Sequence, residues 1–129
     1  MASEDLEKIC QKILDITPKM RSARIINNRG HLVAGGMKGG LNSLEDPKQD
    51  EMLFMELALR VRMRHEFDKE FGSVHFSLSY RDKVLIMSFP LANDDVLLVS
   101  GGKDIDFGKI PFTILEITKD LRTPITKTF

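Results

Sequence analysis

The chain has 129 residues, which is enough for one domain with a single core and too few for a second domain of any size. Its 19 basic and 19 acidic residues cancel, so the overall charge gives no reason to expect nucleic acid or an anionic membrane as a partner. The single cysteine, Cys10, excludes an intramolecular disulfide and a cysteine-only metal site, and we expect it to be a small buried apolar residue.

No apolar run approaches the ~18 residues that span a bilayer, and the polar amino terminus has no signal-peptide core. We therefore predict one cytoplasmic domain over residues 1–129, without membrane insertion and with a tail that frays from about residue 123.

The first half of the chain predicts a helix followed by a hairpin. Ser3 can cap a helix whose apolar residues recur at three- and four-residue spacing as far as Pro18. Two short apolar runs, residues 23–27 and 31–34, flank Asn28-Arg29-Gly30, which tolerates the positive φ of a tight turn. Four glycines between residues 35 and 40 then predict the end of the second strand and a loop to the next helix.

The longest helical pattern runs from Asp46 to Phe71. Asp46 can cap this helix, Pro47 suits its first turn, and Gln49 is placed to complete a capping box. One stripe of apolar residues along it is formed by Met52, Met55, Leu59 and Met63, and a second by Leu53, Leu57 and Val61. One stripe suffices to cover a sheet, so the methionine stripe is either covered by the first helix within one subunit or forms a subunit interface.

The rest of the chain predicts three strands and a closing helix. Residues 73–80 alternate between apolar and polar side chains, which predicts a strand with one buried and one polar face. Denser apolar runs at 84–91 and 96–100 follow after links short enough for antiparallel hairpins, and a helix begins near Lys109. The chain is therefore expected to be α+β, with a five-stranded, mostly antiparallel sheet flanked by helices in the order α-β-β-α-β-β-β-α.

No pattern of residues predicts a catalytic or metal site. The glycines at 35–40 and Gly108-Lys109 do not complete a phosphate loop, and the three histidines lack metal-ligand spacing. Basic residues on the second half of the long helix are interrupted by acidic residues, and Phe67 is the only aromatic residue interleaved with them, which favours a solvated surface over nucleic acid binding. We predict no catalytic residue, no metal and no cofactor.

The segment from Ile25 to Ala34, IINNRGHLVA, together with the order of elements, resembles the roadblock/LC7 superfamily of profilin-like α/β sandwiches. In that family an apolar strand is followed by an aspartate, two further residues, a glycine and a strand that ends in a small residue. Asn27 stands here at the aspartate position. The resemblance implies a non-catalytic domain that dimerises through its second helix and an adjoining edge strand, and that serves as a platform for small GTPases, motors or signalling assemblies.

On this resemblance, the helix contact would be lined by Met52, Met55, Leu59 and Met63, and the strand at 73–80, with His75 and Ser77, would extend the sheet across the dimer. We therefore expect a dimeric scaffold or regulator, acting on a small Ras-like GTPase or another protein. One alternative is a PAS- or profilin-like module that senses a small molecule held between sheet and helices, under a lid at residues 35–45. Another is a hydrolase that uses His75, Ser77 and Ser79.

Overall fold

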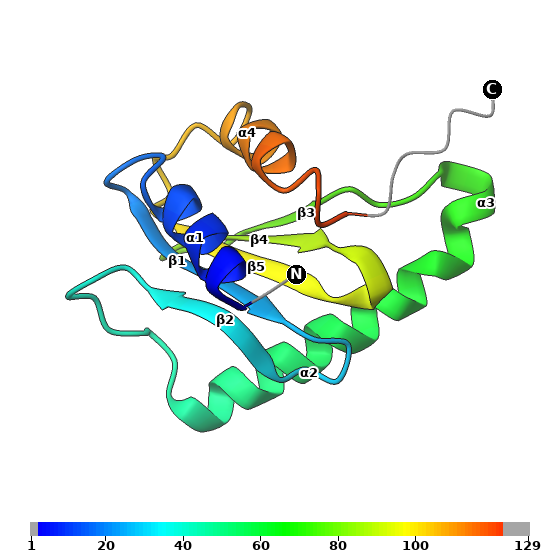
Figure 1. The fold of residues 1–129 in the computed structure, drawn as a ribbon, viewed down its shortest axis with the longest axis horizontal. Coiled ribbons are helices and arrows are strands. Elements are labelled where there is room, and N and C mark those ends of the chain that lie inside the picture. Colours follow the sequence, from blue (N-terminus) through cyan, green and yellow to red (C-terminus); the bar gives the residue numbers. More distant parts are fainter. Residues whose placement is uncertain (1–2, 123–129) are drawn as a thin grey trace.

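The computed structural model describes residues 3–122 and contains a five-stranded sheet in the order β2-β1-β5-β4-β3, in which every neighbouring pair is antiparallel (Figure 1). The strands are β1 (Met20–Ile26), β2 (Leu32–Met37), β3 (Ser77–Tyr80), β4 (Leu85–Pro90) and β5 (Val96–Gly101). The helices are α1 (Ser3–Leu14), α2 (Pro47–Arg64), α3 (Asp68–Phe71) and α4 (Ile110–Ile117), with 3-10 turns η1 (His65–Phe67) and η2 (Ala92–Asp94). The predicted α+β class and order of elements are confirmed.

Helices cover both faces of the sheet, and side chains alternate between the two faces along each strand. Ala23, Ile25, Leu97 and Val99 pack on one face with Ile13 of α1 and Ile114 of α4. Ile26, Val96 and Leu98 pack on the other face against Phe54, Leu57 and Val61 of α2. The central strands β1 and β5 are therefore buried on both faces, which explains why their sequences are so rich in apolar residues.

The hairpin between β1 and β2 forms around the predicted turn, but β2 extends further than predicted. Gly35 and Gly36 do not end the strand; they pair with Arg24 and Ala23 of β1. Gly35 has φ +85, and a Cβ atom there would lie 2.0 Å from the carbonyl oxygen of Ala23. The glycine is therefore required by the close approach of β2 to β1, and the loop to α2 begins after Met37.

The capping box of α2 is present as predicted. The Gln49 N–H donates to Asp46 Oδ1 at 2.8 Å, and the Asp46 N–H donates to Gln49 Oε1 at 3.0 Å. The helix does not continue unbroken to Phe71, however, because α2 ends at Arg64 and the chain tightens into η1 before the short α3. The prediction of one long helix was wrong at this point, where His65 is tied to side chains outside α2.

The predicted strand at residues 73–80 is shorter in the structure, since β3 covers Ser77–Tyr80. Ser77 pairs with Ser88, so the same register would place His75 opposite Pro90, the last residue of β4. Proline has no N–H to donate, and the ladder ends before reaching it. His75 therefore precedes the strand rather than belonging to it.

The remaining predictions agree well with the structure. β4 and β5 form the predicted hairpin, and Pro111 lies in the first turn of α4. Cys10 is buried, and this burial, assisted by the nearby charge of Glu7, raises the pKa of its thiol to about 12. The expected fraying from residue 123 lies outside the described residues.

Candidate interaction surface

Helix α2 presents an apolar stripe on the side opposite the sheet. This outer stripe consists of Met52, Met55, Leu59 and Met63, whose exposed fractions are 70%, 64%, 52% and 63%. The sheet-facing side, which we call the inner face, consists of Phe54, Leu57, Ala58 and Val61, all buried. Neither α1 nor α4 reaches the outer stripe, because both lie on the opposite face of the sheet. Burial of both stripes within one subunit is thus ruled out for the described residues 3–122.

The edge strand β3 lies beside the carboxyl-terminal end of α2. Arg64 at the end of α2 donates from Nη1 to Ser77 Oγ at 2.7 Å, so the first residue of β3 is tied to the helix. β3 pairs with β4 and has no second neighbour in the sheet formed by the described residues. Of the predicted interface residues, Ser77 therefore lies on the free edge, while His75 is an exposed residue of the segment that precedes it.

Charges are divided along α2. As far as Glu56, the helix carries the acidic residues Asp50, Glu51 and Glu56 and one basic residue, Lys48; beyond Glu56 it carries only the basic residues Arg60, Arg62 and Arg64. The predicted pair of Glu56 and Arg60 forms between these halves, one helical turn apart. An acidic end and a basic end are therefore displayed on the same helix as the outer stripe.

Beneath the first half of α2, the structure holds a buried charge that the sequence analysis missed. Arg24 on β1 is 5% exposed, lies 3.1 Å from Asp50 and 3.8 Å from Glu45, and places its guanidinium 5.1 Å from the centre of the Phe54 ring. Its Nε has no hydrogen-bond partner among the described residues. Burial raises the pKa of Asp50; Arg24 opposes this increase, and Glu45 adds to it. The one signal in the sequence was the position of this arginine among the apolar residues Ala23, Ile25 and Ile26.

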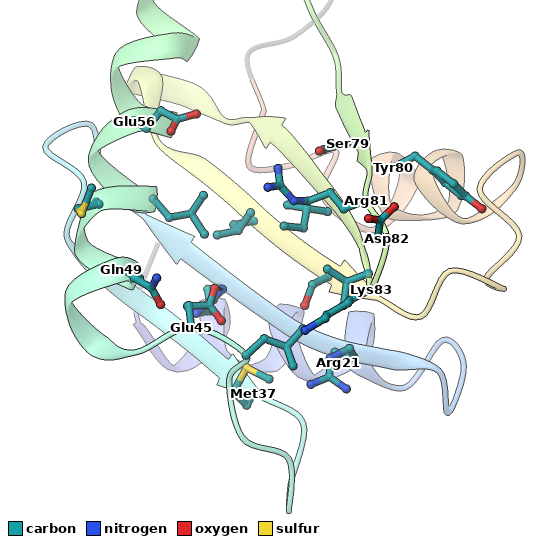
Figure 2. Close-up of a pocket in the computed structure, with 18 of the residues that line it drawn as sticks. Arg21, Met37, Glu45, Gln49, Glu56, Ser79, Tyr80, Arg81, Asp82 and Lys83 are labelled. Carbon is teal, nitrogen blue, oxygen red and sulfur yellow. Dashed lines mark ion pairs between the residues drawn. The ribbon is translucent and has the colours of Figure 1, made fainter.

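A wide groove separates the first half of α2 from β3 and the turn that follows it (Figure 2). Its volume is about 1360 Å³. Apolar side chains on its floor include Leu53, Ile86 and Leu98, while Arg21, Arg24, Arg81 and Lys83 supply basic groups, and Glu45, Glu56 and Asp82 supply acidic ones. Figure 2 shows Arg81 and Lys83 reaching into the groove from the side of β3, across from Glu45 and Glu56.

His65 joins the end of α2 to the turn between β4 and β5. Its Nδ1 lies 2.7 Å from Asp68 Oδ2, and its Nε2 lies 2.7 Å from Asp94 Oδ1. Both ring nitrogens donate when the imidazole is protonated. The hydrogen bonds with Asp68 and Asp94 accordingly raise the pKa of His65. No local pattern in the chain indicated this link, because Asp94 is 29 residues away from His65.

The residues considered for a hydrolase do not form a catalytic arrangement. Ser77 accepts a hydrogen bond from Arg64, and His75 lies outside the strand that carries Ser77 and Ser79. Within residues 3–122, no three or more histidine, cysteine, aspartate or glutamate side chains form a group suited to a metal ion. No helix in the described part of the chain has the length and apolar character needed to cross a membrane.

Comparisons with known proteins agree with this architecture. A family model described as "Family of unknown function (DUF6659)" matches residues 1–123, whereas a sequence search of curated proteins found no significant match. Among solved structures, MglB from Myxococcus xanthus is similar with a TM-score of 0.70 and 13% identity, covering 90% of each chain.

Two further structures show the same likeness. A roadblock/LC7 domain from Streptomyces avermitilis has a TM-score of 0.67 and 14% identity, covering 88% of this chain and 92% of the other. The gliding protein MglB from Thermus thermophilus has a TM-score of 0.68 and 13% identity, covering 92% of this chain and 91% of the other. The chain thus has a roadblock/LC7-like fold.

Proposed function

We propose that this chain, which belongs to the DUF6659 family of unknown function, is a non-catalytic scaffold for a protein partner. The proposed scaffold is a dimer, whose two copies meet through the outer stripe of α2 and the free edge of β3. The observation that carries the proposal is the exposure of Met52, Met55, Leu59 and Met63 on a helix whose inner face is already packed against the sheet. Exposed apolar residues that lie together mark an interaction surface, and methionine adapts readily to a partner.

The edge of β3 supports the same surface. Its unpaired backbone groups can hydrogen-bond to a strand of a second copy, which would join the two sheets and remove an exposed edge. Ser77 would lie within this junction and His75 beside it. The hydrogen bond from Arg64 to Ser77 fixes the edge next to α2, so that both parts of the surface meet the same partner.

The charges of α2 favour an antiparallel arrangement of two copies. In that arrangement the net acidic amino-terminal part of one α2, Lys48 to Glu56, faces the basic carboxyl-terminal part of the other. Parallel helices would place like charges together, which is unfavourable. The outer stripe runs along both halves of α2, and each copy would cover the stripe of the other.

The partner class rests on fold-level likeness alone. Similarity to roadblock/LC7 domains and to MglB favours a regulatory scaffold, and the resemblance implies small Ras-like GTPases as candidate partners. A small-molecule sensor is less well supported, because the groove beside α2 is open and exceeds the roughly 300–1,000 Å³ of typical small-ligand pockets.

Absolute mass measured by light scattering across a dilution series tests the proposal. We expect a dimer for the natural chain and a folded monomer for the Met55→Glu, Leu59→Glu double variant, because two carboxylates in the apolar contact cannot be desolvated without partners. A natural chain that stays monomeric at high concentration would refute the dimer.

A matched control places the same substitution on exposed apolar residues outside α2 and β3. Val33→Glu with Leu41→Glu provides this pair, since these side chains are 40% and 39% exposed. The control should remain dimeric. If it dissociates and the α2 variant does not, the interface lies at the β2 side of the sheet instead.

A further inference from the structure

The groove between α2 and β3 has a charge distribution that identifies a kind of partner. Its carboxylates on the helix side are already engaged within the chain: Glu45 lies near Arg24, and Glu56 pairs with Arg60. On the strand side, Arg81 and Lys83 form no ion pair with any carboxylate among residues 3–122. The groove therefore has uncompensated positive charge along one rim, moderated there by Asp82.

Arg24 provides an independent observation. Its exposed fraction is 5%, it lines the groove, and its Nε has no hydrogen-bond partner in the described part of the chain. A buried donor without a partner costs free energy until an acceptor reaches it. Since Asp50 and Glu45 already face this guanidinium, the acceptor that suits its Nε is a neutral backbone carbonyl of an entering segment.

The floor of the groove limits the partner further. Leu53, Ile86 and Leu98 offer an apolar floor, and a volume of about 1360 Å³ is more than a drug-sized ligand fills. Nucleic acid would place phosphates over this apolar floor and would find Tyr80 as the one aromatic ring in the lining that residues 3–122 supply. An amphipathic segment of a protein satisfies both the floor and the rim.

We propose that this groove binds an acidic amphipathic segment of a partner protein, with its apolar side on Leu53, Ile86 and Leu98 and its carboxylates toward Arg81 and Lys83. The inference rests on the proposed function, since it names the chemistry of the partner that the scaffold would hold. The groove adjoins the dimer contact, because Met52 and Met55 of the outer stripe and Ser79 and Tyr80 of β3 also line it.

The test measures fluorescence anisotropy of a labelled peptide added to the full-length chain. The probe is a peptide that forms an amphipathic helix with leucine on one side and glutamate on the other. We expect saturable binding that weakens by about tenfold in the Arg81→Glu, Lys83→Glu variant, because two attractive charges become repulsive. Both side chains are exposed, so the variant should keep the urea midpoint of the natural chain.

Lys8→Glu with Lys12→Glu is the matched control, because it makes the same change in charge on exposed residues of α1, across the sheet from the groove. Its affinity for the peptide should be unchanged. Equal weakening in the control, or equal binding of a peptide with serine in place of leucine, would show attraction to overall charge and overturn the proposal. Absence of binding by the natural chain would do the same.

Two further results would name a different occupant. Saturable binding of a labelled single-stranded oligonucleotide, in place of the acidic peptide, would assign the groove to nucleic acid. Dissociation of the dimer by Arg81→Glu with Lys83→Glu, seen in light scattering, would assign it to the second copy. If the natural chain dimerises but does not bind the peptide, this inference is refuted and the proposed dimer is retained. If the natural chain is a monomer that binds the peptide, the proposed dimer is refuted and this inference is retained.

Discussion

The inner face and the outer stripe of α2 are built from similar residues and have opposite environments. Leu57 on the inner face is 6% exposed, whereas Leu59, two residues further along, is 52% exposed. The sheet supplies Ile26, Val96 and Leu98 as contacts for the inner face, and no element of residues 3–122 covers the outer stripe. An apolar stripe thus indicates a surface to be covered, while the arrangement of the other elements sets whether the same chain covers it.

The largest expected difference between the two sides comes from shortening one leucine on each. Leu57→Ala should lower the free energy of unfolding by about 3 kcal/mol, because it removes buried methyl groups and leaves a cavity against the sheet. Leu59→Ala should have a smaller effect that grows with protein concentration, since its contacts would form in the dimer. Urea denaturation at several protein concentrations measures both. Equal, concentration-independent losses would mean that the outer stripe is packed within one chain.

A second substitution tests the charge that lies under the inner face. Arg24→Met should lower the free energy of unfolding by about 2 kcal/mol. This loss is smaller than that expected for breaking a fully buried ion pair, because the side chains of Asp50 and Glu45 are 23% and 26% exposed. Urea denaturation at neutral pH measures the loss. Arg62→Met, on the exposed side of α2, is the control and should change little.

The effect of Arg24→Met should depend on pH in a defined direction. Burial already holds the pKa of Asp50 above 3.8, and removing Arg24 raises it further. A carboxyl whose pKa is higher in the folded state binds more protons when folded, so the loss should shrink as pH falls through that raised pKa. Adding Asp50→Asn should recover part of the stability at neutral pH. A loss that is independent of pH would show that packing on Phe54, rather than charge, explains the effect.

The smallest expected effect concerns His65, which contacts Asp68 and Asp94 just after the end of α2. The pKa of His65 is raised above 6.5 in the folded chain, so its stabilising contribution is complete below pH 6.5 and is lost as pH rises through the raised value. The side chain is 51% exposed, and we expect less than about 1 kcal/mol. His65→Gln should remove this part of the pH dependence of the urea midpoint. An unchanged pH profile in the variant would show that the contacts with Asp68 and Asp94 do not contribute.

Local signals along the chain were sufficient to predict much of the fold. The capping box at Asp46 and Gln49 and the turn at Gly30 each depend on residues close together in the chain, and each is present in the structure. The predicted alternation at residues 73–80 is present only in part, because Phe76 and Leu78 pack against the core whereas Tyr80 is 60% exposed. The same local rules failed where a distant element intervened. Gly35 was expected to end a strand, yet the approach of β1 keeps it inside β2, and Pro90 of β4 limits the length of β3.

The candidate surface divides in the same way. The spacing of Met52, Met55, Leu59 and Met63 is enough to predict the outer stripe, because helical periodicity alone places these residues on one side. The groove, the buried Arg24 and the bridge from His65 to Asp94 were not foreseeable, since each joins residues from separate elements. Short-range periodicity and capping were therefore enough to predict the elements and their apolar faces. Which of those faces the chain covers, and which charges it brings together, depends on long-range packing that no local pattern encodes.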